Sequence, residues 1–214
     1  MAVRLNDGLF RFEVTSADNR EGVWKGVRFN FYGKKSGEIC YQYSRATGPE
    51  AFDIDYQLAP QNRHCTTNED CWAAFNWFQK VEKVKIDPDR MAVGGVSVGG
   101  YLSAVFVHLC RDVNIPLRLQ IFNVPAYDSN NAFTPEGAFN RVKWPHESYR
   151  EMKFIPALPT ARMTYLHTSW KCLDQQGQTR CDWRINSMLA SSLGLALALA
   201  FTAEMDRLRD EGEA

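Results

Sequence analysis

Apolar side chains recur along the first half of the chain at spacings that separate strands from helices. Alternation over residues 23–32 and a second apolar run over 51–56 predict two strands. Trp72, Phe75 and Phe78 then follow at intervals of three residues, which predicts a helix with one apolar face. The pattern therefore indicates two strands followed by an amphipathic helix.

The start of this helix carries residues that suit a helix N-terminus. Thr67 is a candidate N-cap, because a threonine hydroxyl can accept a backbone N–H of the first turn. Glu69 and Asp70 follow where the helix dipole favours acidic side chains.

The alternation of strands and helices continues beyond this point. Residues 91–95 and 117–122 predict strands, and 101–111 predicts a helix between them. A last strand is expected over 195–203, and the composition of 189–201 suits a buried strand and its approach. This order predicts a mostly parallel sheet covered by helices.

One segment interrupts the alternation. Residues 126–181 are rich in proline, aromatic residues and arginine, and they are predicted to form an irregular helical insertion. The sequence therefore predicts one domain over 1–214, with a core at about 20–125 and 182–214.

Charge and hydropathy exclude two classes of protein. Lys plus Arg and Asp plus Glu both total 25, so the basic excess of a nucleic-acid-binding protein is absent. The longest apolar stretch, 189–201, is shorter than the roughly 20 residues that a membrane-spanning helix needs.

The 6 cysteines contain no CxxC pair, so neither a zinc ribbon nor a thioredoxin-type site is predicted, and no metal is expected. The first residues contain no apolar run typical of a signal peptide, and we therefore expect a cytoplasmic protein with reduced thiols. Cys172 and Cys181 are the pair to test for a disulfide.

The candidate chemistry lies between a predicted strand and a predicted helix. Gly95-Val96-Ser97-Val98-Gly99 matches the pattern G-x-S-x-G, in which a sharp turn exposes the serine hydroxyl and glycines remove clashing Cβ atoms. The N–H of Val98 would then point toward a developing oxyanion. Taken alone, the pentapeptide is equally a glycine-rich turn that only packs tightly.

Six sequence blocks in order carry a resemblance to a known family. They are DYQLAP at 55–60, ED at 69–70, DPDR at 87–90, GGVSVGG at 94–100, DWRI at 182–185 and the segment 202–214. Their order and spacing resemble the hormone-sensitive-lipase-like serine esterases and lipases, from about Asp53 to residue 214.

The resemblance implies an α/β-hydrolase fold with a helical cap insertion. It implies Ser97 as the nucleophile and Asp206 as the acid of a catalytic triad, acting on a small-molecule ester by acyl transfer. It implies neither a metal nor an organic cofactor. Without the resemblance, Asp206 could instead be the N-cap of a helix.

Parts of the family pattern are missing. The triad order in this fold is serine, acid, histidine, but all 4 histidines precede Asp206. The glycine run that gives relatives an oxyanion hole is replaced by GKKSG at 33–37. The family's last helix and strand are also missing, so the strand over 195–203 is expected to be an uncovered edge of a less stable domain.

Three interpretations follow. The first is a serine ester hydrolase, impaired as the chain stands because the sequence is a fragment or a faulty gene model. The second is a non-catalytic module that binds a small apolar ligand or a protein partner. The third is an active enzyme with unorthodox geometry or with a base from another chain. A homo-oligomer stays open in each.

Overall fold

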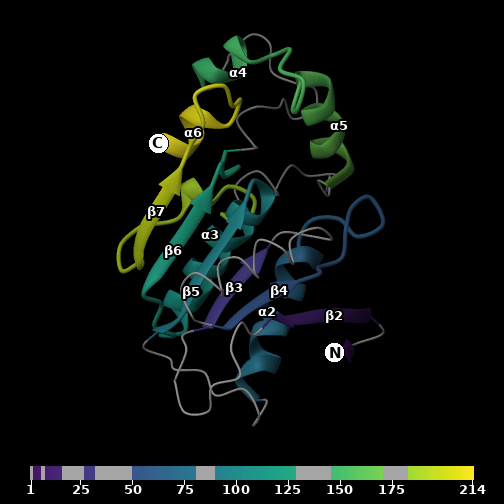
Figure 1. The fold of residues 1–214 in the computed structure, drawn as a ribbon, viewed down its shortest axis with the longest axis vertical. Coiled ribbons are helices and arrows are strands. Elements are labelled where there is room, and N and C mark those ends of the chain that lie inside the picture. The colour runs from purple at the N-terminus through teal and green to yellow at the C-terminus, as the bar shows by residue number, and fades with distance from the viewer. Residues whose placement is uncertain are drawn as a thin grey trace.

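The computed structural model describes residues 2–5, 8–15, 27–31, 50–80, 90–128, 146–170 and 183–214. These residues form a seven-stranded sheet with helices beside it and further helices beyond one end of it (Figure 1). The strands are β1 Ala2–Leu5, β2 Gly8–Thr15, β3 Val27–Phe31, β4 Glu50–Ile54, β5 Ala92–Val96, β6 Leu119–Asn123 and β7 Leu197–Phe201. The helices are α2 Thr66–Lys80, α3 Val98–Asp112, α4 Glu147–Glu151, α5 Thr160–Trp170, the 3-10 helix η3 Ser187–Leu189 and α6 Arg209–Glu213.

The sheet is parallel wherever the sequence predicted its strands. Its order is β1-β2-β4-β3-β5-β6-β7, and the pairs from β4 to β7 are all parallel. This confirms the predicted parallel sheet of an α/β-hydrolase fold. The antiparallel strands β1 and β2 were not predicted, although Phe10, Phe12 and Val14 of β2 alternate with polar residues.

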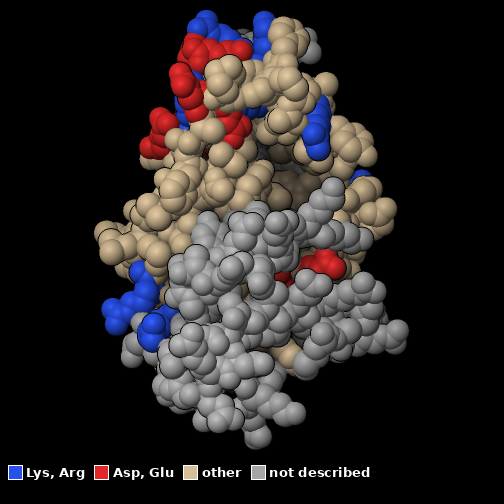
Figure 2. Space-filling view, in the orientation of Figure 1, with Lys and Arg blue, Asp and Glu red and all other residues tan. Residues whose placement is uncertain are grey.

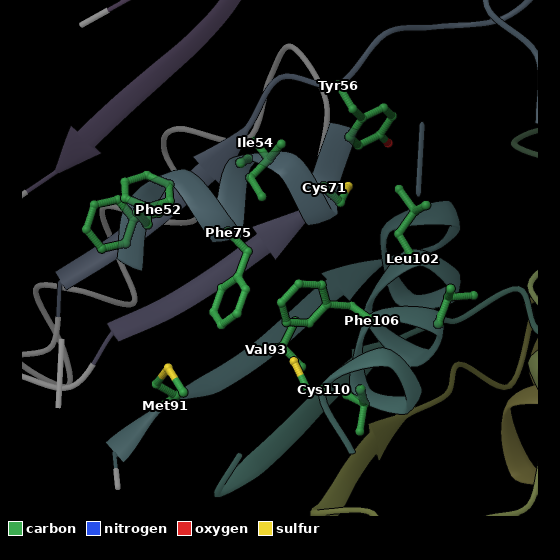
Figure 3. Close-up of a cluster of buried hydrophobic side chains, with 14 of the residues drawn as sticks. Phe52, Ile54, Tyr56, Cys71, Phe75, Met91, Val93, Leu102, Phe106 and Cys110 are labelled. Atoms are coloured by element: carbon green, nitrogen blue, oxygen red, sulfur yellow. The ribbon is translucent and has the colours of Figure 1, made fainter. Parts of the chain in front are cut away.

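The core lies between the sheet and two helices. Helix α3 packs across β3, β5 and β6, and α2 packs against α3. The rings of Phe75 on α2 and Phe106 on α3 meet edge to face with centroids 5.0 Å apart, a favourable geometry for aromatic pairs. Figure 3 shows the two rings side by side, with Val93 of β5 next to Phe106 and Phe52 of β4 farther away in the same cluster. These apolar contacts fix α3 over the centre of the sheet.

The predicted N-cap of α2 was wrong. The helix begins at Thr66, so Thr67 lies inside it, and the N–H of Glu69 already donates to the carbonyl of Cys65. Thr67 is buried, and its hydroxyl donates to the carbonyl of Gln57, 3.4 Å away. A contact with the preceding loop therefore determines the place of this threonine.

The prediction of a buried last strand was also wrong. All five side chains of β7 are exposed, and Leu197 is 79% exposed. The strand lies at the end of the strand order, with β6 as its one partner among the described strands. Neither α2 nor α3, the helices of the core, packs substantially on its faces, so its apolar composition does not bring burial. The expectation that this strand is a sheet edge is confirmed.

Two helices, α4 and α5, lie beyond the carboxyl ends of the parallel strands, inside the predicted insertion (Figure 1). We call the described part of this region, residues 146–170, the cap. Cys172 and Cys181 fall outside the described residues, so their pairing stays a prediction. Of the described cysteines, Cys71 and Cys110 are buried in the core, and burial raises the pKa of the Cys110 thiol to about 12.

No helix among the described residues is both long and apolar enough to cross a membrane. No group of three or more His, Cys, Asp or Glu side chains among them could hold a metal ion.

The exposed strand β7 makes a prediction about self-association. Leu197→Lys is expected to slow aggregation, because a charge on an apolar sheet edge opposes edge-to-edge pairing. The free energy of unfolding should change by less than about 0.5 kcal/mol, since the side chain is exposed. Light scattering and urea denaturation measure both quantities. Leu193→Lys is the control: Leu193 is 82% exposed but lies outside the strand. Equal effects of the two substitutions would show that the strand edge is not the cause.

Candidate active site

Ser97 lies on the tight turn between β5 and α3. Its backbone has φ 55° and ψ −116°, in a region that residues other than glycine rarely adopt. The N–H of Ser97 donates to the carbonyl of Asn123 at 2.9 Å, and its own carbonyl accepts the N–H groups of Tyr101 and Ala126. The end of β6 and the first turn of α3 therefore hold the strained residue in place.

The glycines of the motif permit this turn. A Cβ on Gly95 would overlap the backbone of Gly99, and one on Gly100 would lie 2.8 Å from the Cβ of Pro125. The sequence prediction that glycines at 95 and 99 allow a close approach agrees with this geometry. Val98 is the first residue of α3, so its N–H belongs to a helical turn whose N–H groups lack partners within the helix.

Asp206 lies in the turn between β7 and α6. Its N–H donates to the carbonyl of Ala203 at 2.9 Å, and its Oδ1 accepts the N–H of Leu208 at 3.1 Å. Leu208, rather than Asp206, is the N-cap residue of α6, which corrects the alternative role of Asp206 as a helix N-cap. The carboxylate instead closes a local turn with the backbone.

Ser97 and Asp206 follow the carboxyl ends of two parallel strands of one sheet, so they lie at the same end of the sheet. Figure 1 shows that these strands, β5 and β7, point the same way. Pro125 lies between their elements: it borders Gly100 of α3 and also Gly212 of α6. Leu208, two residues after Asp206, lines the same cavity as Ser97.

This cavity has a volume of about 420 Å³, within the usual range for small-ligand pockets. It is predominantly apolar, and helix α5 of the cap forms one wall. Its lining includes Tyr56, Gln57, Leu58, Thr67, Ser97, Val98, Ala126, Leu158, Met163, His167, Trp170 and Leu208. Charged side chains gather instead over α4 and α6, where Arg209 pairs with Glu151 at 3.0 Å (Figure 2). The arrangement favours an uncharged ligand beside the serine.

The four histidines occupy different places. His108 packs on α3 against Trp183, and burial followed by the charge of Arg111 lowers its pKa. The Nε2 atom of His146 lies 3.1 Å from Oδ2 of Asp128. The backbone N–H of His64 donates to the carbonyl of Trp170.

His167 is the histidine that lines the cavity, a position that the sequence did not indicate. No histidine among the described residues hydrogen-bonds to the Asp206 carboxylate. A serine–histidine–acid triad is therefore not assembled within the described part of the chain.

A buried acidic cluster next to the site was missed by the sequence analysis. Glu211 of α6 is 1% exposed, and its Oε2 accepts both the hydroxyl of Tyr149 and the N–H of Asp128. The carboxylate of Asp128 in turn contacts Asn186 and His146. Burial, with the nearby charges of Asp128 and Asp206, raises the pKa of Glu211 to about 8. The charged sequence around 204–213 gave no signal for this burial.

The residues also match known proteins. A family model described as the alpha/beta hydrolase fold matches residues 28–214. The chain is similar to the carboxylic ester hydrolase LipN of Mycobacterium tuberculosis, at 33% identity over 82% of the chain and 45% of that protein. It is 30% identical to the carboxylesterase NlhH of the same organism, over 79% of the chain and 50% of the relative. The chain thus spans about half the length of these curated relatives.

Solved structures share the fold. The chain superposes over its whole length on 71% of a thermophilic carboxylesterase cloned from a metagenomic library, with a TM-score of 0.82 and 26% identity. It superposes on 68% of a hyperthermophilic esterase from Pyrobaculum calidifontis with the same TM-score, and the 24% identity there speaks for the fold alone.

The turn at Ser97 predicts that a methyl group added at Gly95 destabilises the protein more than one added at Gly194. Gly95→Ala is expected to lower the free energy of unfolding by about 3 kcal/mol, because the new methyl group meets the Gly99 backbone, which cannot move aside cheaply. Gly194→Ala is the comparison, since Gly194 has a positive φ (76°) but a Cβ there would make only ordinary contacts, 3.6 Å and 3.8 Å from the Arg111 side chain. We expect that substitution to cost about 1 kcal/mol. Chemical denaturation compares them, and a smaller loss for Gly95→Ala would contradict the close approach.

Glu211 predicts a pH-dependent stability. Its pKa of about 8 in the folded protein lies above its ordinary value of 4.5, so the folded state holds the proton more tightly. The contribution of this group to the free energy of unfolding is therefore largest below pH 4.5. As the pH rises to about 8 this contribution is lost, and the free energy of unfolding falls by on the order of a few kcal/mol. Its Oε1, without a hydrogen-bond partner among the described residues, agrees with a protonated acid.

Denaturation at a series of pH values tests this assignment. Glu211→Gln should remove the loss of stability between pH 5 and pH 8, because glutamine is neutral throughout. The exposed Glu204→Gln is the matched control and should keep the wild-type profile. A wild-type-like profile in Glu211→Gln would show that another group titrates in this range.

Proposed function

The chain belongs to the alpha/beta hydrolase fold family, and on that premise we propose that it is a serine carboxylic-ester hydrolase that transfers an acyl group through Ser97. This membership confirms the family resemblance that the sequence blocks indicated. One observation carries the proposal: Ser97 has a strained backbone at the strand-to-helix turn, and it lines an apolar cavity. The similarity to bacterial carboxylesterases supports the substrate class.

The chemistry proposed for the site has two steps. The Ser97 oxygen attacks the ester carbonyl while a base accepts its proton, and the alcohol leaves with a proton as an acyl-enzyme forms. Water then attacks the acyl-enzyme and releases the carboxylic acid. The Val98 N–H, at the start of α3, is proposed to stabilise the negative oxygen in both steps.

Asp206 is proposed as the acid that orients and stabilises a histidine base. Within the described residues its carboxylate accepts the Leu208 N–H and contacts no histidine. We therefore propose that the 214-residue chain by itself turns esters over slowly. Loss of a triad base typically lowers the rate by several orders of magnitude.

A second candidate function rests on the same cavity. The space beside Ser97 is formed although no described histidine is bonded to Asp206, and a formed apolar cavity can bind a ligand without reacting with it. A non-catalytic module for a small apolar ligand is therefore the alternative proposal. Reactivity at Ser97 distinguishes the two.

A fluorophosphonate probe tests the proposed nucleophile. We expect one probe per chain, attached at Ser97 and located by peptide mass spectrometry, because the probe reacts with an activated serine hydroxyl. Ser97→Ala should abolish the labelling, whereas Ser169→Ala, which changes another serine of the cavity lining, should leave it unchanged.

The outcomes separate the two candidates. Labelling that persists in Ser97→Ala would remove Ser97 from the mechanism. Absence of labelling, combined with a saturable ligand-induced rise in melting temperature, would support the binding module over the hydrolase.

A further inference from the structure

The loop that follows β4 borders the same cavity as Ser97. Strands β4 and β5 both pair in parallel with β3, which lies between them. Tyr56, two residues after β4, and Ser97, directly after β5, therefore lie at the same end of the sheet. With one strand between them, the ends of β4 and β5 are about 10 Å apart. Both residues line the cavity, so they border one ligand space from neighbouring parts of the sheet.

Helix α2 holds this loop in place. Gln57 donates its backbone N–H and its Nε2 to the carboxylate of Asp70, at 2.8 Å and 3.1 Å. The Thr67 hydroxyl donates to the Gln57 carbonyl at 3.4 Å. The ring of Tyr56 itself belongs to the buried core cluster. These contacts give the tyrosine a set position before any ligand binds.

The hydroxyl of Tyr56 opens into the cavity. It has no hydrogen-bond partner among the described residues, yet it is not one of their fully enclosed unbonded polar atoms, so its oxygen keeps access to open space. Because Tyr56 is only 5% exposed and lines the cavity, that space is the cavity. Figure 3 shows this oxygen at the side of the ring that faces α3, the helix that begins next to Ser97.

The other polar side chains of the inner wall are bonded or enclosed. The hydroxyl of Thr67 and the amide of Gln57 are bonded as described above, and protein atoms enclose both ring nitrogens of His167. Tyr165 is 65% exposed and therefore borders the mouth of the cavity. No Lys, Arg, Asp or Glu is found among the described residues that line the cavity. Tyr56 thus offers this wall an uncharged hydrogen-bond donor.

The surroundings of Tyr56 keep its hydroxyl protonated. Burial, followed by the nearby Cys71 and the carboxylates of Asp53 and Asp55, raises the pKa of Tyr56 above its ordinary value of 10. A protonated phenol can donate one hydrogen bond to a ligand oxygen. The group therefore acts as a donor throughout the neutral pH range.

We propose that Tyr56 is a further catalytic residue of this site, whose hydroxyl donates a hydrogen bond to the carbonyl oxygen of an ester bound at Ser97. The proposal rests on the proposed function, because it treats the cavity beside Ser97 as the ester site. The bond adds to the one proposed from the Val98 N–H, and it strengthens as negative charge develops on the oxygen. The hydroxyl keeps its proton throughout, so Tyr56 is not the base. The favoured ligands are uncharged carbonyl compounds.

A donor from a side chain suits a chain in which the family's glycine run is replaced. Residues 33–37, GKKSG, stand where relatives carry that run, and they lie outside the described residues. Tyrosine is among the side chains that supply such a donor in acyl-transfer sites. Tyr56 places one within the described part of the cavity.

The first experiment compares two ligands that cannot be hydrolysed. They are 2-nonanone, which has a carbonyl group where hexyl acetate has one, and hexyl ethyl ether, which has the same chain length but no carbonyl. Calorimetry gives the dissociation constant of each ligand. The readout is the ratio of the ether's dissociation constant to the ketone's within one variant, and this ratio does not depend on the folded fraction.

We expect Tyr56→Phe to lower this ratio by about 3- to 10-fold, the contribution of one neutral hydrogen bond. The variant should fold, because no described residue loses a hydrogen-bond partner. Tyr165→Phe is the matched control: it removes the same hydroxyl group at the mouth of the cavity and should leave the ratio unchanged.

The second experiment measures the rate of labelling of Ser97 by the fluorophosphonate. The phosphoryl oxygen of this probe takes the place of the ester carbonyl oxygen, so Tyr56→Phe should slow labelling by on the order of 100-fold. Tyr165→Phe should again have no effect.

The results that overturn this proposal differ from those that overturn the proposed function. An unchanged ratio or labelling rate in Tyr56→Phe, an equal shift in Tyr165→Phe, or no binding of the ketone overturns the role of Tyr56. If wild-type Ser97 is labelled all the same, the hydrolase proposal stands without it. A shifted ratio with no labelling of wild-type Ser97 supports the bond from Tyr56 to a carbonyl oxygen and removes the hydrolase.

Discussion

The site depends on a contact between two pieces of backbone, at the end of β5 and the start of α3. Gly95 and Gly99 approach so closely that a Cβ on Gly95 has no room, and this approach leaves Ser97 in a positive-φ conformation. Such a conformation costs on the order of 1–3 kcal/mol for a residue with a side chain. It persists because the hydrogen bonds to Asn123 and Ala126 and the apolar packing of α3 on the sheet hold both ends of the turn.

A second constraint couples the cap to the segment that follows Asp206. Arg207 is fully buried, donates from Nη1 to the Thr160 hydroxyl at the start of α5, and lies over the ring of Tyr149. The Ser148 hydroxyl donates to the Arg207 carbonyl at 2.8 Å, and Tyr149 donates to Glu211. The wall of the cavity and the turn of Asp206 are therefore held by one network. A change that loosens α4 or α5 would also shift the proposed acid.

The sequence correctly predicted the elements whose formation depends mainly on residues close together in the chain. The strand at 92–96, the turn at Ser97 and the helix after it follow from an apolar run, two glycines and a second apolar run. Burial depends on what packs on an element, and this is why the apolar β7 is exposed while the charged Glu211 is inside. Strand β2 pairs with β4, and β1 with β2; the pairing of β2 with β4 joins residues far apart in the sequence, which no short pattern contains. The cavity position of His167 likewise depends on the path of the cap, which its neighbours in sequence do not reveal.

The shape of the turn does not by itself distinguish an enzyme from a binding module. Backbone packing at Gly95 and Gly100 imposes the turn, so the same φ would persist with alanine at position 97. What a hydrolase requires in addition is a base that removes the serine proton, and the described residues leave Asp206 bonded to its own turn. A binding module requires only the apolar cavity, which is formed. The decisive property is therefore the nucleophilic reactivity of the Ser97 hydroxyl, because it depends on a base that the fold does not need.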